Sequence, residues 1–348
     1  MIFYENFIGY FCKNIFNFMI LKNILTFLSF LLLVISCADY NKVNDITLKG
    51  HVFGTTYKIV YLNSGHNYQK SIDSLFYLMN KSLSTYIPTS DISRINNGDS
   101  TVVVDDLFLE VFHKSKMIYE ETNGYFDPTV GNLVNAWGFG PNKEKRNLST
   151  EEVKMQMEFV GLNKVNVVNS KVKKDNLNIY LDFNAIAKGF GIDVVARFLN
   201  SKNVTNYLVE IGGEIRTQGT KENNIPWVIK LVDPVNKEDL KGYKNLNLSN
   251  KSMATSGNYR KFRVTSDGQK FVHTINPKTG YAKESNLLSA SVIASLDCAD
   301  VDAYATAFMT MGLKKVKSFL LTHKNIDAIL LFVDENGDLK EYNTFTKR

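Results

Sequence analysis

Apolar residues recur along the chain with two different periods, and each period predicts a different kind of element. From Ile72 to Leu83 they fall three and four residues apart, which is typical of a helix with one buried face. We therefore expect a helix over residues 68–83, and similar spacing predicts helices over 106–122, 185–199, 300–311 and 314–323. Runs rich in β-branched and aromatic residues predict strands over 51–61, 164–168, 177–181, 204–211, 227–232, 260–264, 288–293 and 328–333.

The order of these elements indicates the fold class. Many strands alternate with a few helices, and neither a regular βαβ period nor a sequence repeat is present. The sequence predicts an α+β fold, with mixed, largely antiparallel sheets and helices packed on them. Ser90 is expected to cap a short turn in the loop 84–97.

An apolar run near the N-terminus predicts export. No residue from Asn23 to Ala38 is charged, and Lys22 stands directly before the run. This is short for a spanning helix, which needs about twenty apolar residues, whereas a positive end, an apolar centre and small residues before a cleavage site are typical of an export signal. The alternative is an uncleaved anchor helix.

Cys37 at the end of this run resembles the lipidated cysteine of a lipoprotein lipobox. We expect a lipoprotein signal peptide over 1–36, lipid such as palmitate on Cys37, a tether over 37–48 and one folded domain over 49–345. The mature protein would then be lipid-anchored to a bacterial cell membrane, with the periplasmic side of the inner membrane as the expected location. Residues 1–18 are atypical for such a leader, so Met19 is the expected start.

Composition excludes several classes of protein. The 41 Lys and Arg exceed the 35 Asp and Glu by a net charge of +6, spread without a basic block, which argues against a nucleic-acid binder. Three cysteines without a CxxC pair exclude zinc ribbons and thioredoxin-type sites. The chain contains no GxxxxGK[ST], GxGxxG or GxSxG motif, so a P-loop, a Rossmann dinucleotide site and a common hydrolase elbow are unsupported.

Two oxygen-bearing side chains on one predicted helix suggest a cation site. Asp302 and Thr306 are four residues apart, so their oxygens project from the same helical face. A carboxylate and a hydroxyl suit Mg²⁺ better than zinc. In the alternative interpretation, Asp302 complements a helix N-terminus and Thr306 bonds to its own turn.

Three further segments are candidates for chemistry or binding. His273 lies where a strand enters a turn, where a histidine is either structural or a catalytic base. The junction from Asp182 to Lys188 joins a strand to a helix through small residues and can expose amides to an anion. Gly212-Gly213 either approaches a flat ligand or is a plain turn.

Taken together, these segments resemble the ApbE family of flavin transferases. The resemblance runs from Gly50 to Asp334, and its nine short matches occur in the family's order, which makes it specific. They are Gly54-Thr55-Thr56-Tyr57, 90–96, Phe126-Asp127-Pro128-Thr129, Trp137-Gly138-Phe139, 182–189, Gly212-Gly213-Glu214, Thr255-Ser256-Gly257-Asn258-Tyr259, 273–280 and 302–306.

The resemblance implies an ApbE-like fold and a set of site residues. It implies that Asp302, Thr306 and the backbone carbonyl of Ala185 bind Mg²⁺. It further implies that FAD is bound by Phe53, Tyr86, Ala136, Trp137, Gly138, Asp182, Lys188, His273, Ile275 and Asn276. Two positions depart from the family: Phe53 stands where many members have Met, and Lys188 where some have Glu.

The reaction implied by the resemblance is transfer of FMN from FAD to a threonine of a target redox protein, with release of AMP. His273 is the candidate for orienting or deprotonating the threonine hydroxyl, although a nearby carboxylate is an alternative. The family's acceptors carry Ser or Thr before Gly-Ala, and this chain has no Gly-Ala dipeptide, so it should not flavinylate itself through that motif. Two alternatives stay open: Mg²⁺-dependent hydrolysis of FAD to FMN and AMP, and a non-catalytic flavin-binding lipoprotein.

Overall fold

The computed structural model describes residues 45–141, 147–232, 243–257, 262–264, 270–282 and 286–345, and in the leader residues 16, 18–20, 22 and 23. Residues 44–348 form one compact unit, and residues 1–43 belong to another. Cys37 and most of the predicted signal lie outside the described residues. Across the part that is described, no helix combines the length and the apolarity needed to cross a membrane.

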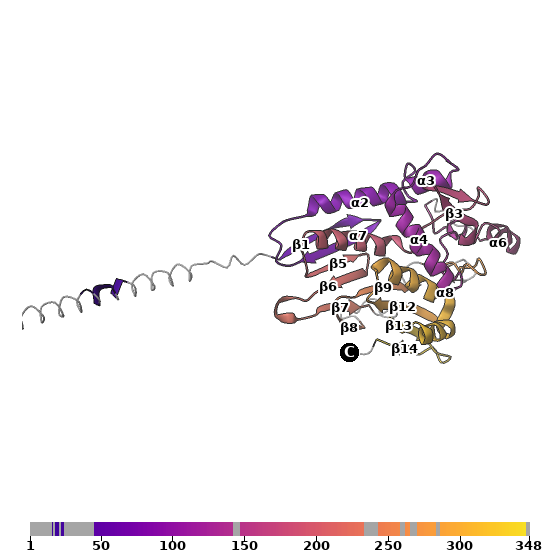
Figure 1. Ribbon diagram of the computed structural model, residues 1–348. Coiled ribbons are helices and arrows are strands. Elements are labelled where there is room, and N and C mark those ends of the chain that lie inside the picture. The colour runs from indigo at the N-terminus through magenta and orange to yellow at the C-terminus, as the bar shows by residue number, and fades with distance from the viewer. Residues whose placement is uncertain are drawn as a thin grey trace, which may run out of the picture. The chain divides into compact units, whose positions relative to one another are not determined.

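An eight-stranded sheet forms the centre of the folded unit, and each pair of neighbouring strands is antiparallel (Figure 1). This confirms the predicted α+β class with largely antiparallel sheets. In spatial order the strands are β1 (Ile46–Val52), β2 (Thr55–Tyr61), β5 (Tyr207–Ile211), β6 (Glu214–Gln218), β9 (Ser252–Gly257), β12 (Leu287–Ala294), β13 (Ile326–Val333) and β14 (Leu339–Asn343).

Helices cover one face of this sheet in two layers. The inner layer is α7 (Ala187–Ser201), packed on β5 and β6, and α8 (Cys298–Thr322), packed on β9 and β12. The outer layer is α2 (Gln69–Leu83), packed on α7, and α4 (Asp106–Glu121), packed on α8. The predicted helices over 300–311 and 314–323 are thus two parts of α8, broken at Gly312, where φ is 74° and ψ is 164°.

A hairpin covers the other face of the sheet. It consists of β7 (Trp227–Leu231) and β8 (Lys244–Leu248), which pair with each other. Alternation along the central strands separates two cores: on β13, Ala328 and Leu330 face the helices, whereas Ile329 and Leu331 join the hairpin's apolar cluster. The sheet is therefore buried on both faces at its centre.

The remaining elements are short. They are α3 (Asp91–Asn96), α5 (Gly131–Ala136), α6 (Thr150–Met157), η1 (Leu162–Lys164), η2 (Glu222–Asn224), β3 (Val165–Val168), β4 (Lys171–Lys174), β10 (Phe262–Val264) and β11 (Lys270–Val272). Ser90 caps α3 as expected, because its side chain accepts a hydrogen bond from the Ser93 amide at 3.2 Å.

Two of the predicted strands differ from the structure. The run 51–61 is not one strand but the end of β1, a turn and β2, because Phe53 and Gly54 adopt φ values of 50° and 73°. The run 177–181 is not a strand; within it Tyr180 forms an isolated parallel bridge to Val130. Ile179 and Leu181 are nonetheless fully buried, whereas Leu177 at the start of the run is 72% exposed.

Candidate functional site

The contact between α7 and α8 brings the predicted cation ligand Asp302 against Gly189. The Asp302 carboxylate is buried and accepts a hydrogen bond from the Gly189 backbone amide at 3.1 Å. Only glycine permits this approach, since a Cβ on residue 189 would lie 2.3 Å from the Cys298 carbonyl oxygen. Burial raises the pKa of the Asp302 carboxyl to about 7; Lys188 opposes this shift and Glu214 adds to it.

Lys188 and Glu214 form an ion pair beside Asp302. The Lys188 Nζ lies 2.6 Å from one carboxylate oxygen of Glu214, which is only 2% exposed. Glu214 begins β6 directly after the turn at Gly212 and Gly213, both of which have positive φ. Of the two alternatives for these glycines, the structure shows the tight turn, which places Glu214 against Lys188 of α7. No sequence pattern predicts a role for Glu214, because only the fold brings it to Lys188.

The other two predicted cation ligands are Thr306 and Ala185. Thr306 lies one turn after Asp302 on α8, and Ala185 lies shortly before α7; both are half-buried. A carboxylate, a hydroxyl and a carbonyl make an all-oxygen donor set, which fits a hard cation such as Mg²⁺. The described residues contain no group of three His, Cys, Asp or Glu able to hold a metal. A cation at Asp302 would thus need further oxygens, which Mg²⁺ usually takes from water and substrate phosphates.

The loop before α7 brings Asp182 and Tyr86 together. The Asp182 amide donates to the Pro128 carbonyl at 2.8 Å, and its carboxylate accepts from the Asn184 amide at 2.8 Å. Burial raises the pKa of Tyr86, and the nearby charge of Asp182 raises it further, although the side chain of Tyr86 is 56% exposed. An exposed aromatic ring beside a carboxylate is suited to ligand contact.

The ring of Trp137, unlike that of Tyr86, is not accessible to a ligand. Trp137 is 2% exposed, and its indole Nε1 donates to the Gly280 carbonyl at 2.8 Å, so its ring belongs to a core that includes Ile275. The neighbouring Ala136 and Gly138 remain half-buried and can present backbone groups.

Phe53 sits in the β1–β2 turn and packs against α7. Its ring contacts Phe76 edge-to-face, with ring centroids 5.7 Å apart, and a Cβ on Gly191 would lie 2.7 Å from it. The ring is half-buried. Phe53 is therefore held on the helix that carries Lys188.

The segment after β11 contacts α8 at Thr310. The side-chain amide of Asn276 donates to the Thr310 carbonyl at 3.4 Å, one turn beyond Thr306. His273 is half-buried between β11 and this turn. The structure therefore brings the His273–Asn276 segment to the helix that carries Asp302 and Thr306.

The segment Phe126-Asp127-Pro128-Thr129 is held by a local network of buried hydrogen bonds. The buried Asp127 carboxylate accepts from the Thr129 amide at 2.8 Å and from its hydroxyl at 2.6 Å. The Thr129 hydroxyl in turn accepts from the Gly161 amide at 2.6 Å. The Pro128 carbonyl accepts the hydrogen bond from the Asp182 amide, so this segment fixes the backbone of Asp182.

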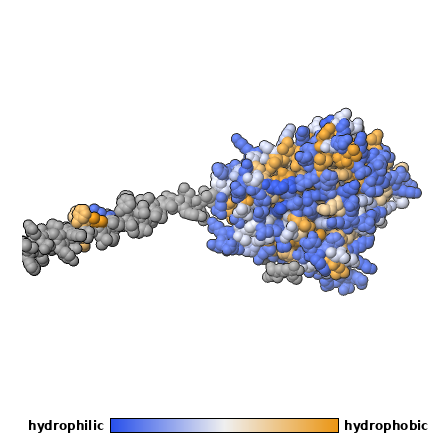
Figure 2. Space-filling model, viewed as in Figure 1, coloured by the Kyte–Doolittle hydropathy of each residue, from blue (hydrophilic) through white to orange (hydrophobic). Residues whose placement is uncertain are grey.

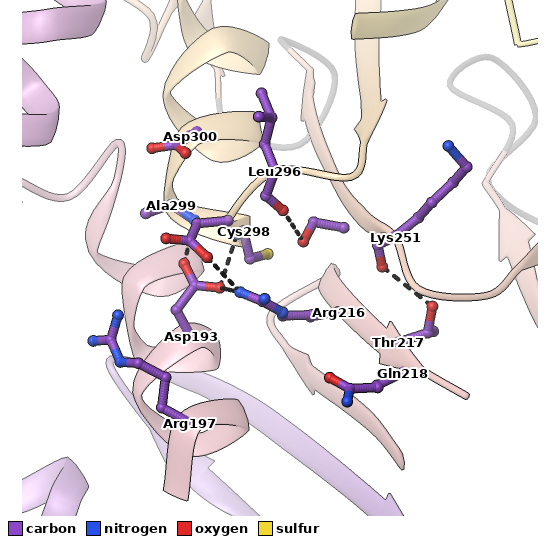
Figure 3. A network of polar contacts seen from close by, with 12 residues as sticks. Asp193, Arg197, Arg216, Thr217, Gln218, Lys251, Leu296, Cys298, Ala299 and Asp300 are labelled. Atoms are coloured by element: carbon purple, nitrogen blue, oxygen red, sulfur yellow. Dashed lines mark hydrogen bonds and ion pairs between the residues drawn. The ribbon is translucent and has the colours of Figure 1, made fainter. Parts of the chain in front are cut away.

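A charged network fixes the start of α8 (Figure 3). The Asp193 carboxylate, on α7, accepts from the Cys298 and Ala299 amides at 2.8 Å each. Arg216 donates to Asp193 and, at 2.7 Å, to Asp297. These contacts fix the first turn of α8 against α7. They therefore also fix where along α7 the Asp302 carboxylate lies, which is at Gly189.

A cavity of about 230 Å³ lies next to this network, and it is polar. Its lining residues are Arg216, Thr217, Gln218, Asn250, Lys251, Ser252, Ser295 and Leu296. None of the predicted site residues is among them. The space lies beside the short β6–β9 pairing, which consists of Ile215–Met253 and Arg216–Ser252 and is followed by a hydrogen bond from the Thr217 amide to the Lys251 carbonyl at 2.9 Å.

Comparisons with known proteins give one consistent result. The family model described as the ApbE family matches residues 53–330. The FAD:protein FMN transferase of Vibrio cholerae is 33% identical over 331 residues, covering 92% of this chain and 97% of that protein. The protein of the same name from Haemophilus influenzae is 32% identical, with 90% and 93% covered.

Solved structures of flavin transferases are also similar to this chain. The Vibrio cholerae flavin transferase ApbE superimposes with a TM-score of 0.76 at 31% identity, covering 87% of this chain and 97% of that one. The Pseudomonas stutzeri flavinyl transferase ApbE gives a TM-score of 0.78 at 26% identity, covering 88% and 96%.

Proposed function

The chain belongs to the ApbE family, and from this premise we propose that it transfers FMN from FAD to a hydroxyl of a target protein in the presence of Mg²⁺. The observation that carries the proposal is the arrangement around Asp302. A buried carboxylate is held by the Gly189 amide beside the Lys188 ammonium, with the Thr306 hydroxyl one turn away. A carboxylate that can bind a metal ion thus lies beside an ammonium group that can pair with a phosphate, and a metal-bound pyrophosphate requires both.

The proposed reaction is a phosphoryl transfer. A threonine hydroxyl oxygen of the target forms a bond to the FMN-side phosphorus of FAD, the bond from this phosphorus to the bridging oxygen breaks, and AMP leaves with that oxygen. The threonine proton passes to a base. Mg²⁺, held by Asp302, Thr306 and the Ala185 carbonyl, would supply positive charge to the pyrophosphate.

The chain's own residues bind and orient the reactants in this proposal. Lys188 pairs with a phosphate oxygen, and His273 orients or deprotonates the attacking hydroxyl. Further contacts to FAD come from Phe53, Tyr86, Asp182, Ile275, Asn276 and the segment from Ala136 to Gly138. In this segment the backbone makes the contact, since the Trp137 ring is buried.

Separation of products tests the proposal. The protein is incubated with FAD, Mg²⁺ and a target domain that carries a Thr-Gly-Ala segment, and the denatured target is examined for flavin fluorescence while AMP is quantified. The proposal predicts covalent flavin on the target and one AMP per flavin. AMP with free FMN and an unlabelled target indicates the hydrolase instead, and unchanged FAD indicates a flavin-binding lipoprotein.

We also propose that the mature protein is exported and anchored through lipid on Cys37, on the periplasmic side of the inner membrane. The uncharged run from Asn23 to Ala38 with a cysteine at its end supports this. Targets would then be redox proteins of the same compartment. Metabolic labelling with palmitate tests the anchor: the proposal predicts label on the full chain and none on Cys37→Ser.

A further inference from the structure

Glu214 is a buried carboxylate at the candidate site, and it contacts neither a proposed metal ion nor FAD in the reaction proposed for this site. It is 2% exposed and pairs with Lys188 at 2.6 Å through one oxygen. Its second oxygen, Oε2, is buried and has no hydrogen-bond partner among the described residues. Most buried carboxylate oxygens in proteins are hydrogen-bonded, so Glu214 is only half satisfied by the fold.

We propose that Glu214 is a positioning residue for FAD binding, which fixes the Lys188 ammonium beside Asp302 so that it meets the pyrophosphate. This inference rests on the proposed function. It adds to that function a residue that does not itself touch the reacting atoms.

Mobility of the lysine is the reason that such a residue is needed. A lysine side chain has four rotatable bonds, so its ammonium group can occupy many positions in the absence of a partner. Lys188 stands in the first turn of α7, and its side chain is 30% exposed, so water competes for its ammonium group. An ion pair with a buried carboxylate on β6 removes this freedom before FAD arrives.

The placement of Glu214 is itself rigid. Thr55 lies against the Gly212 turn, whose amide donates to the Thr56 carbonyl at 3.0 Å, and the Gly213 amide donates to Glu210 at 2.7 Å. A carboxylate carried by such a turn cannot follow a moving lysine. Glu214 therefore determines where the Lys188 ammonium lies, rather than the reverse.

A double-mutant cycle tests the proposal. FAD affinity is measured by flavin fluorescence in the whole protein with Mg²⁺, for wild type, Glu214→Gln, Lys188→Met and the double variant. Glu214→Gln keeps the shape of the side chain and removes its charge, and we expect it to weaken FAD binding about tenfold. In the Lys188→Met background the same change should have little effect, since there is no ammonium left to position. Glu214→Asp should restore part of the affinity.

The exposed pair Arg197–Glu110 provides the matched control, because it also joins α7 to another element, at 2.7 Å. Glu110→Gln should leave FAD affinity unchanged. The proposal is overturned if Glu214→Gln binds FAD like wild type, or if it weakens binding equally with and without Lys188, which is the result for a merely structural role.

The outcomes separate this inference from the proposed function. If wild type binds FAD and the cycle shows coupling but no target is labelled, only the transferase proposal fails. If labelling occurs without coupling, only the role of Glu214 fails. If wild type binds no FAD, both fail.

Discussion

The Gly189 amide and the Asp302 carboxylate are joined by a hydrogen bond of 3.1 Å across the α7–α8 contact. This bond fixes one oxygen of the proposed cation ligand and orients the other, as the second shell of a metal site does. It exists because residue 189 has no side chain, so the backbones of the two helices come together at this point. The geometry of the site therefore depends on helix packing as much as on its ligands.

Gly189→Ala should separate the two helices. The new methyl group would meet the Cys298 carbonyl at 2.3 Å, and backbone cannot move aside as a flexible side chain does. We expect a loss of about 1–3 kcal/mol in the free energy of unfolding, together with a higher Mg²⁺ requirement. Urea unfolding and Mg²⁺ titration of FMN transfer measure the two effects. An unchanged Mg²⁺ requirement would show that this contact does not orient Asp302.

Asp302→Asn should abolish turnover and leave the fold intact. The amide oxygen can still accept from Gly189, but it brings no charge to a cation. Since losing an outer-shell partner already costs up to about a hundredfold in metal affinity or activity, we expect a rate loss of at least this size. The melting temperature should stay near that of wild type. Normal activity with a normal melting curve would remove Asp302 from the metal site.

His273→Ala should slow the reaction and preserve FAD binding. A positioned general base contributes about 10²–10⁴-fold to a rate, and the loss should fall on kcat rather than on the affinity for FAD. His51→Ala, which changes an exposed histidine on β1, is the control. A rate equal to that of wild type would exclude His273 from the mechanism.

The raised pKa of the buried Asp127 carboxyl predicts that part of the protein's stability is lost as the pH rises. Burial raises its pKa from 3.8 to about 6, with hydrogen bonds from Thr129 opposing the shift. The folded protein thus holds this proton more tightly than the unfolded chain does, so the stabilisation is complete below about pH 4 and is lost as the pH rises through about 6. Asp127→Asn stays neutral, and its stability relative to wild type should rise by up to about 3 kcal/mol over this interval.

Asp99→Asn is the control of opposite sign. Hydrogen bonds from Thr101 and then Arg94 lower the pKa of Asp99 to about 2, so its stabilisation is present above about pH 4 and is lost as the pH falls towards 2. Relative to wild type, this variant should become less stable as the pH rises. Urea unfolding at several pH values measures both. A constant difference between Asp127→Asn and wild type would contradict the raised pKa.

The sequence predicts those parts of the site that depend on local spacing. Asp302 and Thr306 share a helical face because they are four residues apart, and the Gly212-Gly213 turn follows from two adjacent glycines. The hairpin turn at Phe53-Gly54 was missed because phenylalanine is unusual at positive φ, where Asn-Gly or Asp-Gly is the typical signal.

Other features depend on contacts between distant segments. The partnership of Glu214 with Lys188 arises only when β6 lies under α7, and no local pattern indicates it. The burial of the Trp137 ring is similar: Gly280, which accepts its hydrogen bond, comes from a loop far along the chain. A tryptophan between small residues is compatible with a ligand contact or with a core, and packing decides between them.

The most direct test of the central claim is to weigh an acceptor. The protein expressed from Ala38, without the predicted signal peptide, is incubated with FAD, Mg²⁺ and a peptide containing Asp-x-x-Thr-Gly-Ala-Thr, and the peptide is analysed by mass spectrometry. We expect the peptide to gain one FMN in phosphoester linkage on its first threonine, and the Asp302→Asn protein to give no gain. A peptide of unchanged mass, with FAD converted to FMN and AMP or left intact, would contradict it.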